Sequence, residues 1–160
     1  ESDIKLWYEI CKCGIIRDDE TLESSYRTRL IEHIGYNPDT IFFVMLDGKE
    51  VATVTALTEE NGTGWLHMVT AKPEARGKGV AKYLIAIAEA ALYKSGMEKI
   101  LLQTKEFRAV AIKAYLSAGY KPVLYTDEME ERWTAFLNEY GYSEIDAVDE
   151  DGSFLKTLNC

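Results

Sequence analysis

The stretch from Trp65 to Gly96 constrains the fold of this chain more than any other. Its first residues are apolar or β-branched and end before Pro73, which predicts a strand, because proline cannot donate to a strand ladder. From Val80 onward apolar residues recur at helical spacing, and Gly96 stands where a left-handed residue would end the helix. The sequence therefore predicts a strand, a basic glycine-rich turn and a long helix.

The turn, residues 76–81, has the features of an anion site. Gly77 and Gly79 leave its backbone N–H groups unobstructed, and these groups open a helix whose dipole is positive at this end. Arg76 and Lys78 add positive charge. A plain surface turn is the alternative, since glycine is common at turns for conformational reasons alone.

Two familiar phosphate loops do not fit these letters. A nucleoside-triphosphate loop requires Ser or Thr after Gly-Lys, but Gly79 follows Lys78. A dinucleotide loop requires a third glycine three positions after the second, and that position is Lys82. The turn therefore needs a phosphate ligand of another kind.

The letters resemble the acyl-coenzyme A loop of the GNAT N-acetyltransferase superfamily. In that family Arg or Gln is followed, after two residues, by Gly, one residue, and Gly or Ala. Arg76, Gly79 and Ala81 fill this pattern, and Pro73 precedes the arginine by three residues, as is usual there. The resemblance covers the chain from about its first helix to Tyr125.

A second block after the next strand supports the resemblance. The family has an asparagine, then an alanine, then a tyrosine followed by a Gly-aromatic pair. Ala111, Tyr115 and the pair at 119–120 fall at those spacings. Arg108 stands where the asparagine usually is, so the contact of this position with the pantetheine arm is open.

The resemblance implies an α/β fold with a mixed, mostly antiparallel central sheet, a parallel, splayed strand pair and flanking helices. It implies an N-acetyltransferase that moves an acetyl group from acetyl-CoA, a co-substrate, to a primary amine by direct attack in a ternary complex, without a metal. The alternative from another class is an acyl-CoA-binding sensor or interaction domain of the same fold that does not catalyse.

The resemblance also implies roles for single residues. Tyr115 matches the tyrosine that donates a proton to the coenzyme A thiolate, and His67, the only ionisable residue of the central strand, matches the position of a base. Either side chain can instead be a structural core residue, and Glu32, His33 and Asp127 are weaker candidates for the base. The residues expected to bind the donor are Val69, Thr70, Ala71, Arg76, Gly77, Lys78, Gly79, Val80, Ala81 and Arg108.

Elsewhere the pattern predicts an alternation of helices and strands. Asp47-Gly48 is the strongest hairpin signal of the sequence, and it joins two segments rich in β-branched and aromatic residues. In the family the segment between the two helices at the start forms one wall of the acceptor site, which makes Trp7, Tyr8, Tyr26 and Arg27 candidate acceptor contacts. Helices are expected at 2–13, 18–33, 110–117 and 127–140, and strands at 40–46, 50–58, 99–104 and 120–125.

The two ends of the chain are where it departs from the family pattern. We expect a transferase domain over residues 1–141 and an acidic tail over 142–160, partly ordered, with a short strand at 153–158. The helix at 127–140 replaces a closing strand, and its apolar face around Trp133 is core, a homodimer contact or a lid over the acceptor site. The family's first strand precedes the first helix, so either it lies before Glu1 or the sheet is one strand short.

Composition narrows the class of protein. The net charge of −9 argues against a nucleic-acid partner and permits a cationic small-molecule or peptide amine, although runs of acidic residues are usually solvated surface. No apolar run approaches the ~20 residues of a membrane helix. Three cysteines, an odd number, do not form a disulfide framework and favour a reducing compartment, taken as the cytoplasm; Cys11 and Cys13 lack the partner ligands of a zinc site.

Overall fold

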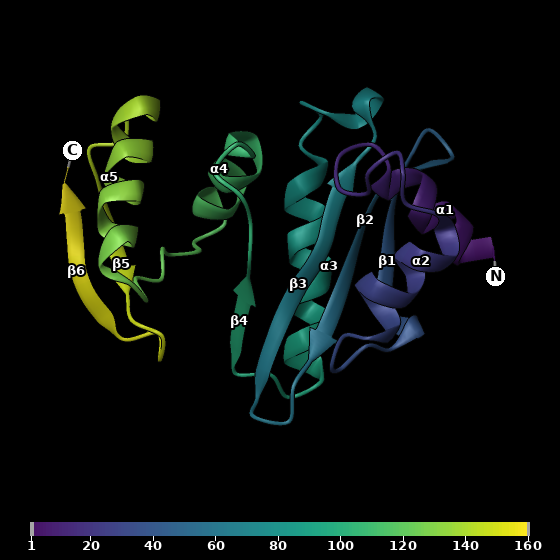
Figure 1. Cartoon of the computed structure of the whole chain (residues 1–160), viewed down its shortest axis with the longest axis horizontal. Helices are drawn as coiled ribbons and strands as arrows, with labels where there is room; N and C mark the ends of the chain where they lie inside the picture. The colour runs from purple at the N-terminus through teal and green to yellow at the C-terminus, as the bar shows by residue number, and fades with distance from the viewer. Residues whose placement is uncertain (1, 160) are drawn as a thin grey trace. The chain divides into compact units, whose positions relative to one another are not determined.

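The structure is a computed structural model that describes residues 2–159 (Figure 1). The chain divides into two compact units, with the boundary between Gln103 and Thr104. The first unit contains the strand, turn and helix that the sequence singles out. The second holds everything after the fourth strand, and each unit has its own apolar core.

The first unit is built on a four-stranded mixed sheet in the order β1-β2-β3-β4. The strands β1, β2 and β3 form an antiparallel meander, and β4 runs parallel to β3. This confirms the α/β fold with one parallel pair. The strand bounds are Ile41–Leu46 (β1), Lys49–Thr58 (β2), Thr63–Ala71 (β3) and Lys99–Leu102 (β4).

Turn chemistry joins these strands as the sequence predicted. Asp47 and Gly48 both have positive φ, 51° and 75°, which matches the right-handed twist of a two-residue hairpin. After β3 a short 3-10 turn, Pro73–Ala75, leads into helix α3, Val80–Lys94, and Gly96 follows that helix at φ 82°. The predicted strand, turn and helix are confirmed.

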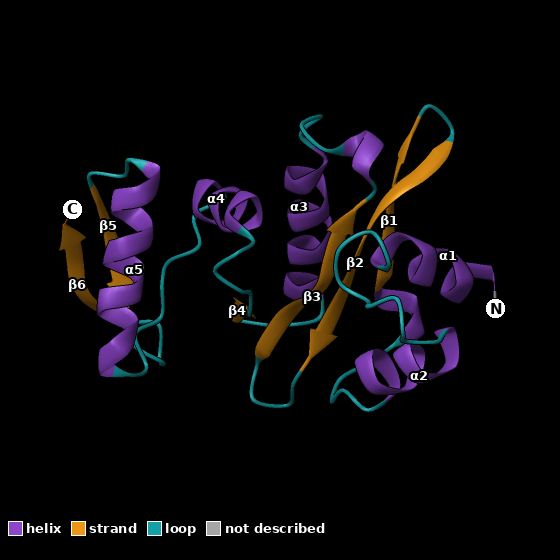
Figure 2. Ribbon diagram, turned by 45° about the horizontal axis from the view of Figure 1, so that its top comes forward, coloured by secondary structure: helices purple, strands orange, loops and turns teal. Residues whose placement is uncertain are grey.

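Helices cover both faces of the sheet (Figure 2). Helix α3 packs on one face, where the lack of a side chain at Gly64 admits Leu92; a Cβ there would lie 2.9 Å from Leu92 Cδ2. Helix α1, Ser2–Cys11, packs on β2 and β3 from the other face and buries Trp7 completely. Trp7, a candidate acceptor contact, is therefore a core residue in a cluster with Leu30 and Met68.

The second predicted helix differs from the expectation in two ways. It begins later, at Leu22, because Thr21 and Ser24 form a capping box, in which each side chain accepts from the other residue's backbone N–H. It also changes character: the α-helical part, α2, is Leu22–Tyr26, and Arg27–Ile31 is a π-helix. Figure 2 shows α2 on the sheet face that α1 covers.

The second unit contains helices α4, Ala109–Ser117, and α5, Asp127–Tyr140, and the hairpin of β5, Glu144–Val148, with β6, Phe154–Asn159. The predicted strand at 120–125 is wrong: only a single bridge, Val123 to Val148, forms there. Pro122 lacks a backbone N–H, so a regular ladder is interrupted at this point.

The C-terminal segment is a hairpin whose apolar side packs on α5. The strand expected at 153–158 is β6, and β5 was not expected. Phe136 and Leu137 are buried with Ala147 and Leu158, and Trp133 packs against this cluster. The Trp133 face of α5 therefore contributes to the core of the second unit.

Candidate active site

The central strand β3 contains a bulge just before its last three residues. Thr55 of β2 lies opposite His67, but Thr53 lies opposite Thr70, so β3 has one residue more than β2 in this interval. Met68 takes up the extra length with φ 53°, a left-handed conformation that costs a residue with a Cβ roughly 1–2 kcal/mol. Its buried side chain holds it in place. The bulge re-aims the residues that follow it.

Those residues, Val69, Thr70 and Ala71, have a strand on one side only. The parallel ladder with β4 ends at the pair Leu66 and Leu102, while β3 runs on to Ala71 along β2. Within residues 2–159 no other strand pairs with this end of β3. Its outer backbone N–H and C=O groups are thus available to an extended ligand, as in strand addition.

The glycine turn connects this strand end to α3. Gly77 and Gly79 have φ of 76° and 73°, which glycine adopts without strain. A Cβ would meet nothing within 4 Å at Gly77 and only Lys82 Cε, at 3.8 Å, at Gly79, so the conformation and not crowding requires glycine here. No side-chain hydrogen bond caps α3, so the amides that open it, at Val80 and Ala81, lack a capping acceptor at the positive end of the helix dipole.

Positive side chains surround the turn, although the whole chain is acidic. Arg76, Lys78 and Lys82 are exposed, and Lys72 is half-buried. Arg76 Nη2 also donates to the carbonyl oxygen of Cys13, 2.6 Å away, which ties the turn to the segment after α1. The guanidinium therefore contributes charge at the turn and fixes the turn's position.

His67 lies two residues before the free strand end, on the face that α1 and α2 cover. Its Nε2 is 2.6 Å from the carbonyl oxygen of Arg29, and its ring lies 4.3 Å, centroid to centroid, from that of His33. Burial lowers the pKa of His67 to about 4, the hydrogen bond to Arg29 works in the opposite direction, and the charge of His33 adds to the lowering. His67 is thus a neutral imidazole at physiological pH.

Tyr115 and Arg108 belong to the second unit, one at each end of α4. Tyr115 is 8% exposed, and burial raises the pKa of its phenol to about 12, while the nearby charge of Arg108 lowers it. The guanidinium of Arg108 lies 5.3 Å from the ring centroid of Phe107. A phenol in this state keeps its proton at neutral pH and acts as a hydrogen-bond donor.

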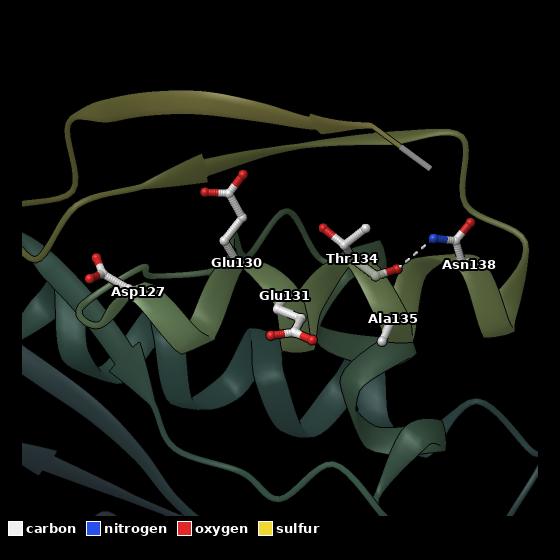
Figure 3. A pocket seen from close by; sticks show the side chains of 6 residues that line it. All are labelled: Asp127, Glu130, Glu131, Thr134, Ala135 and Asn138. Carbon is white, nitrogen blue, oxygen red and sulfur yellow. Dashed lines mark hydrogen bonds between the residues drawn. The ribbon is translucent and has the colours of Figure 1, made fainter.

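The second unit also has an open hollow of about 560 Å³ along α5 (Figure 3). None of the residues expected to bind the donor lines it, and neither Tyr115 nor His67 does. Figure 3 shows the carboxylates of Asp127, Glu130 and Glu131 pointing in different directions, and Glu130 is paired with Lys156 at 2.6 Å. Asp127, one of the weaker candidates for the base, lies here. Across the described chain, 2–159, no group of three or more His, Cys, Asp or Glu side chains is arranged to hold a metal ion.

Sequence reasoning did not find three groups that shape the site. Two are backbone carbonyls, of Cys13 and Arg29, which have no sequence signature. The third is Met68, whose left-handed conformation is unusual for a residue with a Cβ. His33 was a weak candidate for the base, and its ring lies against that of His67 at an interplanar angle of 49°.

The fold and the turn define an α/β domain in which a basic, glycine-rich helix start lies next to an unpaired strand end. The sequence profile of the acetyltransferase (GNAT) family matches residues 6–120. That span is most of the chain, and the chain belongs to this family. No curated protein sequence matches it.

Solved structures of GNAT acetyltransferases share the fold. The ribosomal-protein-S18-alanine N-acetyltransferase from Escherichia coli is 17% identical, with a TM-score of 0.58 over 79% of this chain and 81% of that one. The aminoglycoside N-acetyltransferase AAC(6')-Iy, in complex with CoA, is 18% identical, with a TM-score of 0.58 over 75% and 82%. Glucosamine-6-phosphate N-acetyltransferase from Arabidopsis thaliana is 21% identical, with a TM-score of 0.55 over 76% and 87%.

Proposed function

We propose that this chain transfers an acetyl group from acetyl-CoA to a primary amine by direct attack in a ternary complex. One observation carries the proposal: the N-terminus of α3, which follows a glycine-rich turn and has no side-chain cap, comes soon after the unpaired end of β3 in the chain. The first feature suits a pyrophosphate and the second suits an amide-containing arm, and the two are joined by only a few residues. Coenzyme A has both parts in one molecule.

The reaction needs a neutral amine, whose nitrogen attacks the thioester carbon. The C–N bond forms as the C–S bond breaks, the amine loses one proton and the coenzyme A thiolate gains one. The backbone groups of Val69, Thr70 and Ala71 are proposed to hold the pantetheine arm and to polarise the thioester carbonyl. His67 is proposed as the acceptor of the amine proton, since its imidazole is neutral.

Tyr115 is proposed to stabilise the leaving thiolate. With a pKa of about 12 its phenol is a weaker acid than a thiol of pKa ~8.5, so complete proton transfer to sulfur is uphill. A hydrogen bond donated to the developing negative charge still lowers the barrier. For this role Tyr115 needs only an O–H group that donates a hydrogen bond, and a lowered pKa is not required.

The acceptor is proposed to be a small-molecule or peptide amine. Structural neighbours act on aminoglycosides, on glucosamine 6-phosphate and on an alanine of ribosomal protein S18, as their names state. The net charge of −9 favours a cationic amine over an acidic one. A cytoplasmic location is part of the proposal, supported by the free thiols of Cys11 and Cys13; no helix within residues 2–159 is long and apolar enough to cross a bilayer.

A non-catalytic acyl-CoA sensor is the second candidate, and one observation favours it. A base of pKa about 4, as in His67, has little affinity for a proton, which weakens the case for turnover. A sensor needs the donor site but neither His67 nor Tyr115.

Calorimetric titration with acetyl-CoA tests the donor site first. The native chain is expected to bind saturably, and Gly79→Glu is expected not to, because it places a carboxylate against the phosphates. Free thiol release is then measured with aminoglycosides, polyamines, amino acids and a peptide N-terminus. Binding with thiol release from at least one amine supports the enzyme, binding without release supports the sensor, and no binding overturns both.

A further inference from the structure

The π-helix at Arg27–Ile31 releases one backbone carbonyl from the helix. Its last turn closes with the N–H of Glu32 donating to the carbonyl of Arg27, five residues back, at 3.0 Å. In an α-helix the N–H of His33 would donate to the carbonyl of Arg29. Here it donates to Leu30, at 3.0 Å, and Arg29 is left without a helical donor. Isolated π turns of this kind frequently occur at functional sites.

His67 supplies the missing donor. The carbonyl oxygen of Arg29 has only lone pairs, so the 2.6 Å contact requires that His67 Nε2 carry the proton. A neutral imidazole has one N–H, so Nδ1 is then unprotonated. The Arg29 carbonyl thereby selects one tautomer and orients the ring.

The groups around His67 keep the resting ring neutral, so the Nδ1 lone pair is not already occupied by a second proton. The His33 ring lies against it from the π-helix side, and the Arg29 guanidinium is held by both carboxylate oxygens of Glu20, at 2.7 and 2.8 Å. On the sheet side the residue opposite is Thr55, which is buried and uncharged. No carboxylate among the described residues is in contact with His67 to stabilise an imidazolium.

We propose that the π-helix is a positioning element, which holds His67 as the Nε2–H tautomer and so presents the Nδ1 lone pair as the base for the acceptor amine. The tautomer is a property of the folded chain alone. Its use as a base rests on the proposed acetyl transfer.

The tautomer is read directly by long-range ¹H–¹⁵N correlation NMR on the His67 ring. The native chain is expected to show protonated Nε2 and unprotonated Nδ1. Deleting Thr28, an exposed residue, closes the π turn to an α turn and is expected to abolish the fixed tautomer. The matched control Thr28→Ala does not change the chain length and is expected to retain the fixed tautomer of His67. A native ring protonated at Nδ1, or a deletion variant with an unchanged ring, overturns the proposal.

A point variant covers the case in which the deletion prevents folding. The amide nitrogen of His67→Gln reaches about the position of Nε2 and can donate to Arg29, but nothing replaces Nδ1. We expect kcat to fall about 100-fold, with KM for acetyl-CoA changed less than about twofold. An unchanged kcat overturns the base role. If no amine is acetylated by the native chain, the proposed function fails, while the NMR result still decides whether the π-helix fixes the tautomer.

Discussion

A histidine that donates one ring proton to a carbonyl and lies against a second histidine makes the stability of this fold depend on pH. The pKa of His67 is about 4 in the folded chain and near 6.5 in an unfolded one, so the unfolded state binds more protons between these values. The contribution of neutral His67 to stability is therefore complete above pH 6.5 and is lost as the pH falls toward 4.

The first prediction compares the native chain with His67→Gln in urea unfolding across this range. As the pH falls from 6.5 to 4, the free energy of unfolding of the native chain is expected to decrease by up to about 3 kcal/mol more than that of the variant. The reason is that glutamine keeps the hydrogen bond to Arg29 and does not titrate. Acidic residues titrate equally in both proteins and cancel in the difference. Parallel stability curves for the two proteins would contradict the lowered pKa of His67.

The second prediction concerns the phenol of Tyr115. Tyr115→Phe is expected to lower the rate of thiol release about 10- to 100-fold with the affinity for acetyl-CoA unchanged, because one hydrogen bond to the developing thiolate is lost. Tyr125→Phe is the matched control, since that side chain is 54% exposed and lies in the same unit. Equal rates of thiol release in the native chain and in Tyr115→Phe would contradict the role of the Tyr115 phenol.

At the scale of the element, α3 offers an internal comparison, because it has a left-handed glycine at each end. Gly79 at φ 73° precedes it and Gly96 at φ 82° follows it, and a Cβ would be within 3.4 Å of nothing at either position. Replacement by alanine therefore costs similar strain at both ends, about 1–2 kcal/mol each. Only the first glycine faces the proposed phosphate.

The third prediction follows from this symmetry. Gly79→Ala and Gly96→Ala are expected to lower the midpoint of thermal unfolding by similar amounts. Only Gly79→Ala is expected to weaken the binding of acetyl-CoA, about tenfold or more, because the new Cβ lies in front of the helix N-terminus. The measurements are a thermal melt and a calorimetric titration of each variant. Equal loss of affinity in both would mean that strain on α3, and not the turn itself, controls binding.

Elements with strong local chemistry could be predicted from the sequence. The Asp47-Gly48 hairpin and the helix end at Gly96 are set by backbone conformations that only a few residue types adopt. The C-terminal hairpin has a similar signal: Asp151-Gly152 turns the chain there, and the carboxylate of Asp149 accepts from the N–H groups of Asp151 and Ser153. Because the residues around that pair are acidic, the sequence favoured a partly ordered tail over the two strands, β5 and β6, on either side of the turn.

Other features depend on contacts that are distant in sequence. The π-helix contains ordinary helix-forming residues, and what distinguishes it is the His67 side chain 38 residues after Arg29. The bulge at Met68 likewise depends on the pairing of β3 with β2 and on burial of the methionine. The turn at residues 76–81 was predictable because its glycines, its basic residues and the helical apolar spacing that follows are all properties of the local sequence.

At the scale of the whole molecule, the charge of the chain and the charge of the turn act in opposite directions on an anionic donor. Acidic residues number 27 against 18 Lys and Arg, which repels acetyl-CoA at long range. Lys72, Arg76, Lys78 and Lys82 lie in or near the turn and would attract the anion at the proposed donor site. At an ionic strength of about 0.1 M the screening length is about 10 Å, so added salt removes the distant repulsion before it weakens the contacts.

The last prediction is that added salt changes the KM values of the two substrates in opposite directions. Raising KCl from about 20 to about 150 mM is expected to lower KM for acetyl-CoA, since screening weakens the long-range repulsion of the anion. It is expected to raise KM several-fold for an acceptor with two or more positive charges, because the same field attracts that molecule. Initial rates of thiol release measure both, and sucrose at matched osmolality is expected to change neither. If both KM values rise together, attraction at the glycine turn and not the net charge governs the approach of the donor, and the acidic surface then has no part in sorting the two substrates.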